Sequence, residues 1–105
     1  MPVAHKSIIV TGAGCGIGEG TARHLAAQGA LVTVNDINAE AGERVAAEIR
    51  AAGGQAHFVR ADVTCSADVQ ALVAAAVQQY GRLDCVVNNA GWTHRNRPLL
   101  EVSEA

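Results

Sequence analysis

The feature that most constrains this fold is a glycine-rich segment that directly follows a short apolar run. Residues 8–10 (Ile-Ile-Val) lead into residues 11–18, which read Thr-Gly-Ala-Gly-Cys-Gly-Ile-Gly. A buried strand that turns at glycines and continues as a helix presents unpaired backbone N–H groups at the helix N-terminus, where an anion binds favourably. Glycine suits such a turn because a Cβ atom would hold a phosphate away from the backbone. The segment therefore predicts a strand–turn–helix unit that binds a pyrophosphate.

The glycine spacing departs from the strict dinucleotide fingerprint G-x-G-x-x-G. Begun at Gly12, that fingerprint requires a glycine where Ile17 stands, and begun at Gly14 it fails as well. The spacing present is Gly-x-x-x-Gly-x-Gly, formed by Gly12, Gly16 and Gly18. A glycine turn alone also occurs as a plain strand–helix connection, so at this point both interpretations stay open.

Short β-branched runs alternate with helical patterns along the chain. Asn38 and Ser66 are expected to cap the second and third helices, and glycines follow all three. This alternation predicts an α/β fold, a Rossmann-type doubly wound parallel sheet, here with its first four strands in the order 3-2-1-4 and three helices. Strands are expected at residues 7–11, 31–35, 57–60 and 84–87, and helices at 16–28, 39–52 and 67–80.

Composition and charge argue against several classes of protein. The net charge is −2 and the arginines are scattered apart from Arg95 and Arg97, so no nucleic-acid partner is expected. The longest purely apolar run, residues 71–77, is too short to cross a membrane. Three widely spaced cysteines favour reduced thiols and a cytoplasmic location, and four histidines without ligand spacing predict no metal site.

Asp36 stands at the end of the second expected strand, about 20 residues beyond the glycine turn. A carboxylate there can accept hydrogen bonds from both hydroxyls of an adenosine ribose, and it would repel a 2′-phosphate. Cys15 occupies a turn position where a basic side chain could have bound that phosphate. The pattern favours NAD over NADP, although Asp36 taken alone is equally typical of a solvated acid at a strand end.

Two further polar segments follow the third and fourth expected strands. Asp62 follows the third strand, at a point that overlies the adenine pocket in this topology; an ordinary loop aspartate is the alternative. Residues 88–91 (Asn-Asn-Ala-Gly) follow the fourth strand, and they should meet the glycine turn because strands one and four are neighbours. Asn88 is placed to hydrogen-bond across the sheet, while Ala90 and Gly91 are small enough to let a cofactor pass close to the backbone.

Together these motifs resemble the N-terminal part of a short-chain dehydrogenase/reductase, over essentially the whole chain. The resemblance implies NAD(P)-dependent oxidation of an alcohol or reduction of a carbonyl on a small-molecule substrate, by an enzyme that is a homo-oligomer when full length. The residues expected to bind the cofactor, NAD in preference to NADP, are Gly12, Gly14, Cys15, Gly16, Ile17, Gly18, Asp36, Ile37, Asp62, Val63, Asn89, Ala90 and Gly91.

The proton-donating residues of that family have no counterpart in this chain. By resemblance they are a Tyr with a Lys four residues later, aided by a Ser and an Asn. Here Asp84 stands four residues after Tyr80, the one tyrosine, and Lys6 is the one lysine. Because Tyr80 continues the apolar face of the third helix, we interpret it as a core residue and expect no catalytic residue. Residues 1–105 are interpreted as a dinucleotide-binding domain, the N-terminal part of a longer single-domain enzyme.

Two alternatives to the enzyme remain at this point. One is a non-catalytic dinucleotide-binding module, and the other is a truncated product without activity. The segment from His94 to Asn96 is similar to members of the family that resemble 3-oxoacyl-carrier-protein reductases. Arg95 and Arg97 could meet an anionic substrate there, or belong to a solvated loop.

Overall fold

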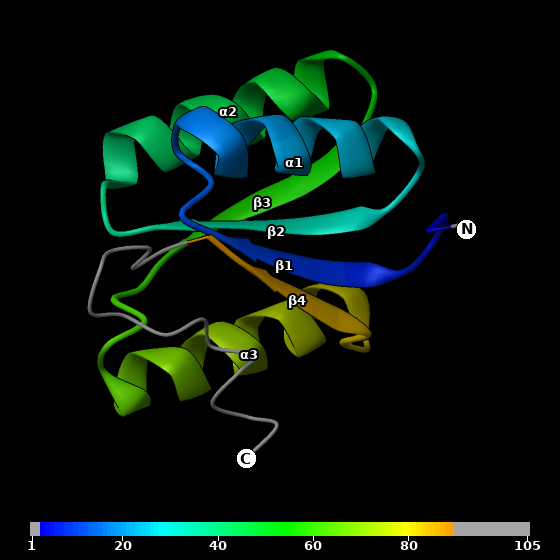
Figure 1. The fold of residues 1–105 in the computed structure, drawn as a ribbon. Coiled ribbons are helices and arrows are strands. Elements are labelled where there is room, and N and C mark those ends of the chain that lie inside the picture. Colours follow the sequence, from blue (N-terminus) through cyan, green and yellow to red (C-terminus); the bar gives the residue numbers. More distant parts are fainter. Residues whose placement is uncertain (1–2, 90–105) are drawn as a thin grey trace.

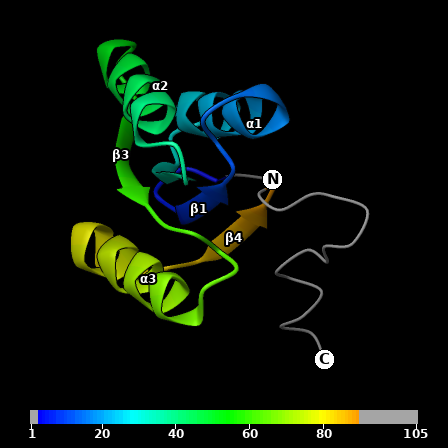
Figure 2. The same cartoon turned by 90° about the vertical axis from the view of Figure 1, so that its left-hand side faces the viewer.

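The computed structural model describes residues 3–89, which form one parallel sheet covered by helices on both faces. Helices α1 and α2 lie over one face and α3 lies over the other (Figure 1), and the view in Figure 2 shows the same three layers from the side. The strand order is β3-β2-β1-β4, so the predicted fold class and strand order are confirmed. The elements are β1 (Ser7–Thr11), α1 (Gly16–Ala27), β2 (Leu31–Asp36), α2 (Ala39–Ala51), β3 (Gln55–Arg60), α3 (Ser66–Tyr80) and β4 (Cys85–Asn88).

Alternate side chains of the central strand β1 belong to two separate hydrophobic cores. Ile8 and Val10 pack in the core beneath α1 and α2, and Ile9 packs with Leu72 on the side of α3. Strands buried on both faces require continuous apolar runs, which explains why these sequences are rich in valine and isoleucine. Six of the nine buried residues of α1, α2 and α3 are alanine or glycine, which let the helices approach the sheet closely.

The two predicted helix caps have different outcomes. Asn38 caps α2 as predicted, since its side-chain oxygen accepts a hydrogen bond from the N–H of Ala41 at 3.1 Å. The prediction of Ser66 as a cap is wrong: Ser66 is already helical, and Cys65 holds the cap position without a side-chain hydrogen bond. The chain turns earlier than expected because the N–H of Cys65 donates to the carbonyl of Asp62 at 2.9 Å.

The apolar face of α3 is narrower than its sequence pattern indicates. The helical spacing of Leu72, Ala76 and Val77 predicts that all three lie on this face, but only Leu72 and Ala76 are buried and Val77 is 42% exposed. Tyr80, at the end of this face, donates its hydroxyl to the carbonyl of Val32 at 2.9 Å. Burial raises the pKa of Tyr80 to about 12, and the residue ties the last turn of α3 to β2.

His57 is half-buried beside Tyr80, with its Nε2 atom 2.7 Å from the Thr33 hydroxyl oxygen and its ring edge-on to the tyrosine ring at 5.2 Å. Burial lowers the pKa of His57, and the positive charge of Arg50 lowers it further. The unfolded chain therefore binds more protons than the folded chain as the pH falls through this range. The corresponding stability is fully present above about pH 6.5 and is lost as the pH falls towards the folded pKa.

We expect the substitution His57→Gln to reduce the loss of thermal stability between pH 7 and pH 5. Glutamine keeps a polar group near Thr33 but does not take up a proton in this range. Thermal unfolding followed by circular dichroism at both pH values measures the difference. His24→Gln is the control, because His24 is exposed on α1. An acid-induced drop in Tm as large in His57→Gln as in the parent chain would contradict the prediction.

Candidate functional site

The glycine turn between β1 and α1 is shaped by two left-handed residues and one very close backbone approach. Gly12 and Gly16 both have φ of +62°, a region that L side chains rarely adopt. A Cβ atom on Gly18 would lie 2.0 Å from the carbonyl oxygen of Gly12, so the first turn of α1 packs directly onto the turn. The first N–H groups of a helix lack partners within it. The turn therefore presents hydrogen-bond donors to an anion at the carboxyl end of β1.

Two adjoining clefts open around this turn, and both are lined by Gly12 and Cys15. They have volumes of about 330 and 530 Å³. The structure thus brings the turn together with residues from the ends of β2, β3 and β4, as the predicted topology requires. Among the expected site residues, the smaller cleft adds Asp36, Ile37, Asp62 and Val63, and the larger one adds Ile17, Gly18 and Asn89.

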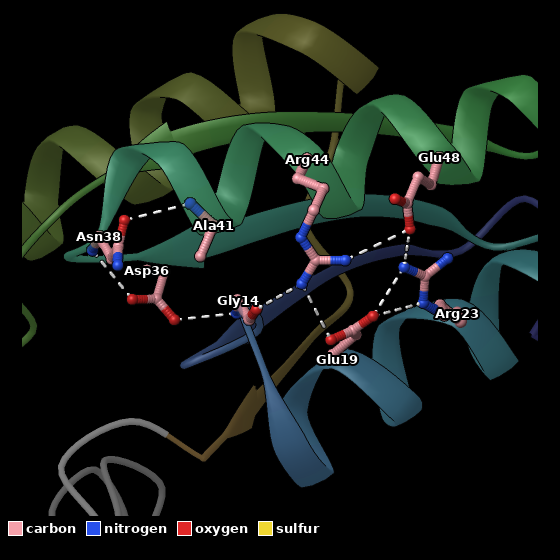
Figure 3. A network of polar contacts seen from close by, with 8 residues as sticks. All are labelled: Gly14, Glu19, Arg23, Asp36, Asn38, Ala41, Arg44 and Glu48. Atoms are coloured by element: carbon pink, nitrogen blue, oxygen red, sulfur yellow. Dashed lines mark hydrogen bonds and ion pairs between the residues drawn. The ribbon is translucent and has the colours of Figure 1, made fainter.

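Asp36, the last residue of β2, has a carboxylate that is held in place on both of its oxygen atoms (Figure 3). Oδ2 accepts a hydrogen bond from the N–H of Gly14 at 2.8 Å, and Oδ1 accepts one from the N–H of Asn38 at 2.9 Å. A carboxylate has about four acceptor positions. The remaining positions of Asp36 are sufficient to accept two further hydrogen bonds.

Asp62 lies in a turn that fixes its side chain at the end of β3. Its Oδ1 atom accepts from the N–H of Thr64 at 2.9 Å and from the Thr64 hydroxyl at 2.6 Å. These bonds, the hydroxyl bond above all, lower the pKa of Asp62. Asp68 on α3 accepts from the N–H of Asp62 at 2.9 Å, so both the backbone and the side chain of Asp62 are oriented.

Thr11 joins the carboxyl ends of β1 and β4. Its hydroxyl donates to Oδ1 of Asn88 at 2.7 Å and accepts from the N–H of Asn89 at 2.9 Å. The expected hydrogen bond of Asn88 across the sheet is therefore present. Within the described range 3–89, the buried Nδ2 atom of Asn89 has no hydrogen-bond partner. Ala90 and Gly91, which were also expected to contribute to the site, lie outside the described residues.

Asn35, which precedes Asp36 and is fully buried, is a structural residue of the site that was not among those expected from the sequence. Its side-chain amide donates to the backbone carbonyls of Val59 at 3.0 Å and Ala61 at 3.2 Å, and the backbone carbonyl of Asn35 accepts from the N–H of Ala13 at 2.8 Å. Asn35 thus connects the end of β2 to β3 and to the glycine turn. The available signal was a polar residue in an otherwise apolar strand.

Two further structural findings concern metals and membranes. Across residues 3–89, no cluster of three or more His, Cys, Asp or Glu side chains is arranged to hold a metal ion. Over the same range no helix has the length and apolar character needed to span a bilayer. The cysteines Cys15, Cys65 and Cys85 are all exposed and unpaired.

Comparison with known protein families assigns the chain. Residues 6–105 match the sequence profile of the short chain dehydrogenases. The chain belongs to the short chain dehydrogenase family. It is similar to a 2,5-dichloro-2,5-cyclohexadiene-1,4-diol dehydrogenase of Sphingobium indicum, with 50% identity over 98 residues, which cover 93% of this chain and 38% of the relative. This chain therefore spans well under half the length of that curated relative.

Two solved structures share the fold of this chain. A hydroxysteroid dehydrogenase from Escherichia coli superposes with a TM-score of 0.82 and 45% identity, covering 85% of this chain and 37% of that one. A short chain dehydrogenase/reductase from Burkholderia phymatum, solved in complex with NAD, superposes with a TM-score of 0.79 and 34% identity. The match covers 82% of this chain and 31% of that one. Family membership makes the chain part of an oxidoreductase family with a nicotinamide cofactor.

Proposed function

We propose that this chain is the NAD-binding part of an enzyme that transfers hydride between nicotinamide and an alcohol or ketone group of a small-molecule substrate. The observation that carries the proposal is the convergence of the glycine turn, Asp36, Asp62 and Asn89 on two adjoining clefts. Taken singly, each of these features also has a purely structural explanation. Together they meet at the carboxyl edge of a doubly wound sheet, which is the place where such folds bind ligands.

The clefts suggest a division of the dinucleotide along the sheet edge. The N–H groups around Gly16 and Gly18 bind the pyrophosphate, and the absent Cβ of Gly18 lets the first turn of α1 pack against the backbone of Gly12. The smaller cleft receives the adenosine, with its ribose at Asp36 and its adenine at Asp62. The larger cleft, which includes Asn89, receives the nicotinamide half. The roles of Gly14, Cys15, Ile17, Ile37, Val63, Ala90 and Gly91 in this site remain predictions.

The electrostatics around Asp36 support NAD as the preferred cofactor. Its two remaining acceptor positions match the two hydroxyls of an adenosine ribose, whereas a 2′-phosphate would bring negative charge against a carboxylate. Cys15 offers no positive charge at the turn. The guanidinium of Arg44 is close, but two glutamates, Glu19 and Glu48, already pair with it.

The bound cofactor supplies the hydride acceptor or donor, and these residues bind and orient it. We propose that the groups that move the proton lie in a longer polypeptide, of which this chain is the N-terminal part. That enzyme would be cytoplasmic and homo-oligomeric. In the natural polypeptide, a Tyr-x-x-x-Lys sequence about 50–60 residues beyond Ala105 would support this proposal.

Calorimetric titration of the natural polypeptide that contains this chain tests the proposal. We expect NAD to bind at least tenfold more tightly than NADP, because the repelled 2′-phosphate and the lost hydrogen bond of the 2′-hydroxyl together outweigh about 1.4 kcal/mol. Folded protein that binds neither cofactor would contradict the proposal. Equal affinities would contradict the NAD preference. NAD binding without hydride transfer from an alcohol, or from the reduced cofactor to a ketone, would favour a non-catalytic module.

A further inference from the structure

We propose that Gly14 and Arg44 are positioning residues for Asp36, and that they determine how strongly the chain discriminates the adenosine ribose of its cofactor. This inference rests on the proposed binding of NAD. Gly14 occupies a free position of the Gly-x-x-x-Gly-x-Gly spacing, so the spacing itself does not require a glycine there. Arg44 belongs to α2 and lies in no motif of the sequence.

Gly14 is a glycine because Asp36 lies against it. Its φ is not among the positive values of this chain, so the backbone conformation does not exclude a side chain. A Cβ atom at Gly14 would instead lie 2.8 Å from Oδ2 of Asp36 and 3.0 Å from the Cβ atom of Ala41. The N–H of the same residue donates to that Oδ2 atom at 2.8 Å. The missing side chain therefore permits the contact that fixes the carboxylate.

The carboxylate of Asp36 is held from two directions at once. Gly14 holds Oδ2 from the glycine turn, and the N–H of Asn38 holds Oδ1 from the start of α2. Each oxygen keeps about one acceptor position. A carboxylate fixed in this way meets two ribose hydroxyls without first losing its rotational freedom, which is the advantage of preorganisation.

Arg44 holds the other side of the Gly14 residue. Its Nη2 atom donates to the carbonyl oxygen of Gly14 at 3.3 Å (Figure 3). The same guanidinium pairs with Glu19 of α1 at 3.3 Å and with Glu48 of α2 at 3.4 Å. Arg23 pairs with the same two glutamates, at 2.6 Å in the case of Glu19. The position of Gly14 is thereby linked to a group of four charged side chains that bridges α1 and α2.

This ion-pair group stays charged over the neutral range. The hydrogen bond from Arg23 lowers the pKa of both Glu19 and Glu48, and these glutamates in turn raise the pKa of Arg23. Because the four side chains are partly exposed to solvent, which screens their charges, the pairs contribute little to overall stability. Their geometric effect on Gly14 is separate from any such contribution, and it can be measured at the cofactor.

The test compares the affinity for NAD with that for an NAD analogue whose adenosine ribose lacks its 2′-hydroxyl. In the unsubstituted natural polypeptide, NAD should bind about tenfold more tightly than the analogue, the value of one hydrogen bond to a charged group. In Gly14→Ala we expect this ratio to fall towards one, because the new Cβ displaces the carboxylate. Gly20→Ala is the matched control, since a Cβ there meets nothing within 4 Å. Calorimetry gives the affinities, and circular dichroism confirms folding.

A second pair of variants tests Arg44 and does not depend on the folding of Gly14→Ala. Arg44→Met removes the hydrogen bond to the carbonyl of Gly14. We expect the ratio of the affinities for NAD and for the analogue to fall two- to fivefold, because a single long hydrogen bond is lost. Arg23→Met removes a charge from the same group without touching Gly14, and its ratio should be unchanged.

The outcomes separate this inference from the proposed function. If the substitutions at Gly14 and Arg44 weaken NAD and the analogue equally, or leave the ratio unchanged, the positioning role is overturned while NAD binding stands. If the unsubstituted protein is folded and binds neither ligand, the proposed function itself is overturned, and the positioning role with it.

Discussion

Replacement of Asp36 with alanine is expected to weaken NAD binding about a hundredfold and to leave NADP binding much less affected. The variant loses acceptors for two ribose hydroxyls, and a hydrogen bond to a charged group is worth about 1.5–3 kcal/mol. A total near 3 kcal/mol corresponds to about a hundredfold change in affinity. For NADP, the binding free energy lost with the hydrogen bond to Asp36 is offset by the removal of the repulsion between the carboxylate and the 2′-phosphate. Calorimetric titration of both cofactors measures the two affinities.

The control for this substitution is Glu40→Ala, which removes an exposed acid from the first turn of α2. It changes the net charge by the same amount and should leave the preference for NAD intact. A decrease shared equally by NAD and NADP in Asp36→Ala would contradict the assignment of Asp36 to the ribose. It would indicate that the carboxylate supports the local fold through its bonds to Gly14 and Asn38.

The second large effect is expected from Gly18→Ala, which should destabilise the fold by about 3 kcal/mol or more. The new Cβ would lie 2.0 Å from the carbonyl oxygen of Gly12 and 2.7 Å from its carbonyl carbon. Overpacking costs typically 1–3 kcal/mol where side chains can move aside, and here the obstacle is backbone. Urea denaturation gives the free energy of unfolding of both proteins.

Gly20→Ala again provides the matched control, because it makes the same change two residues further along α1. A Cβ there lies in open space, and alanine favours a helix over glycine by up to about 1 kcal/mol. We therefore expect this variant to be as stable as the parent chain or slightly more so. A Gly18→Ala variant with unchanged stability would show that the turn can open without cost.

The architecture and the positions of the main candidate residues around the glycine turn could be predicted from the sequence because their signals are local. Alternating strands and helices, the glycine turn and the cap at Asn38 each depend on a few neighbouring residues. The general rule for parallel sheets then placed the ends of β1 and β4 together, and the bond between Thr11 and Asn88 follows from that rule.

The features that escaped prediction depend on contacts between segments far apart in the sequence. A periodic pattern identifies Val77 as apolar, but it does not reveal how much of α3 the sheet covers. Ser66 has the chemistry of a cap, but the hydrogen bond of Cys65 to Asp62 starts the helix elsewhere. The contact of Gly14 with Asp36 joins a turn to another strand, and no spacing rule describes it.

The four charged side chains between α1 and α2 form a closed ring in which each has two partners of opposite sign (Figure 3). Loss of any one leaves the other three connected, so single substitutions at Glu19, Arg23 or Glu48 should be tolerated and should accumulate freely as sequences diverge. Arg44 alone among the four also binds Gly14. Substitutions should therefore accumulate slowly at Arg44, which contacts the glycine turn, and faster at the other three positions.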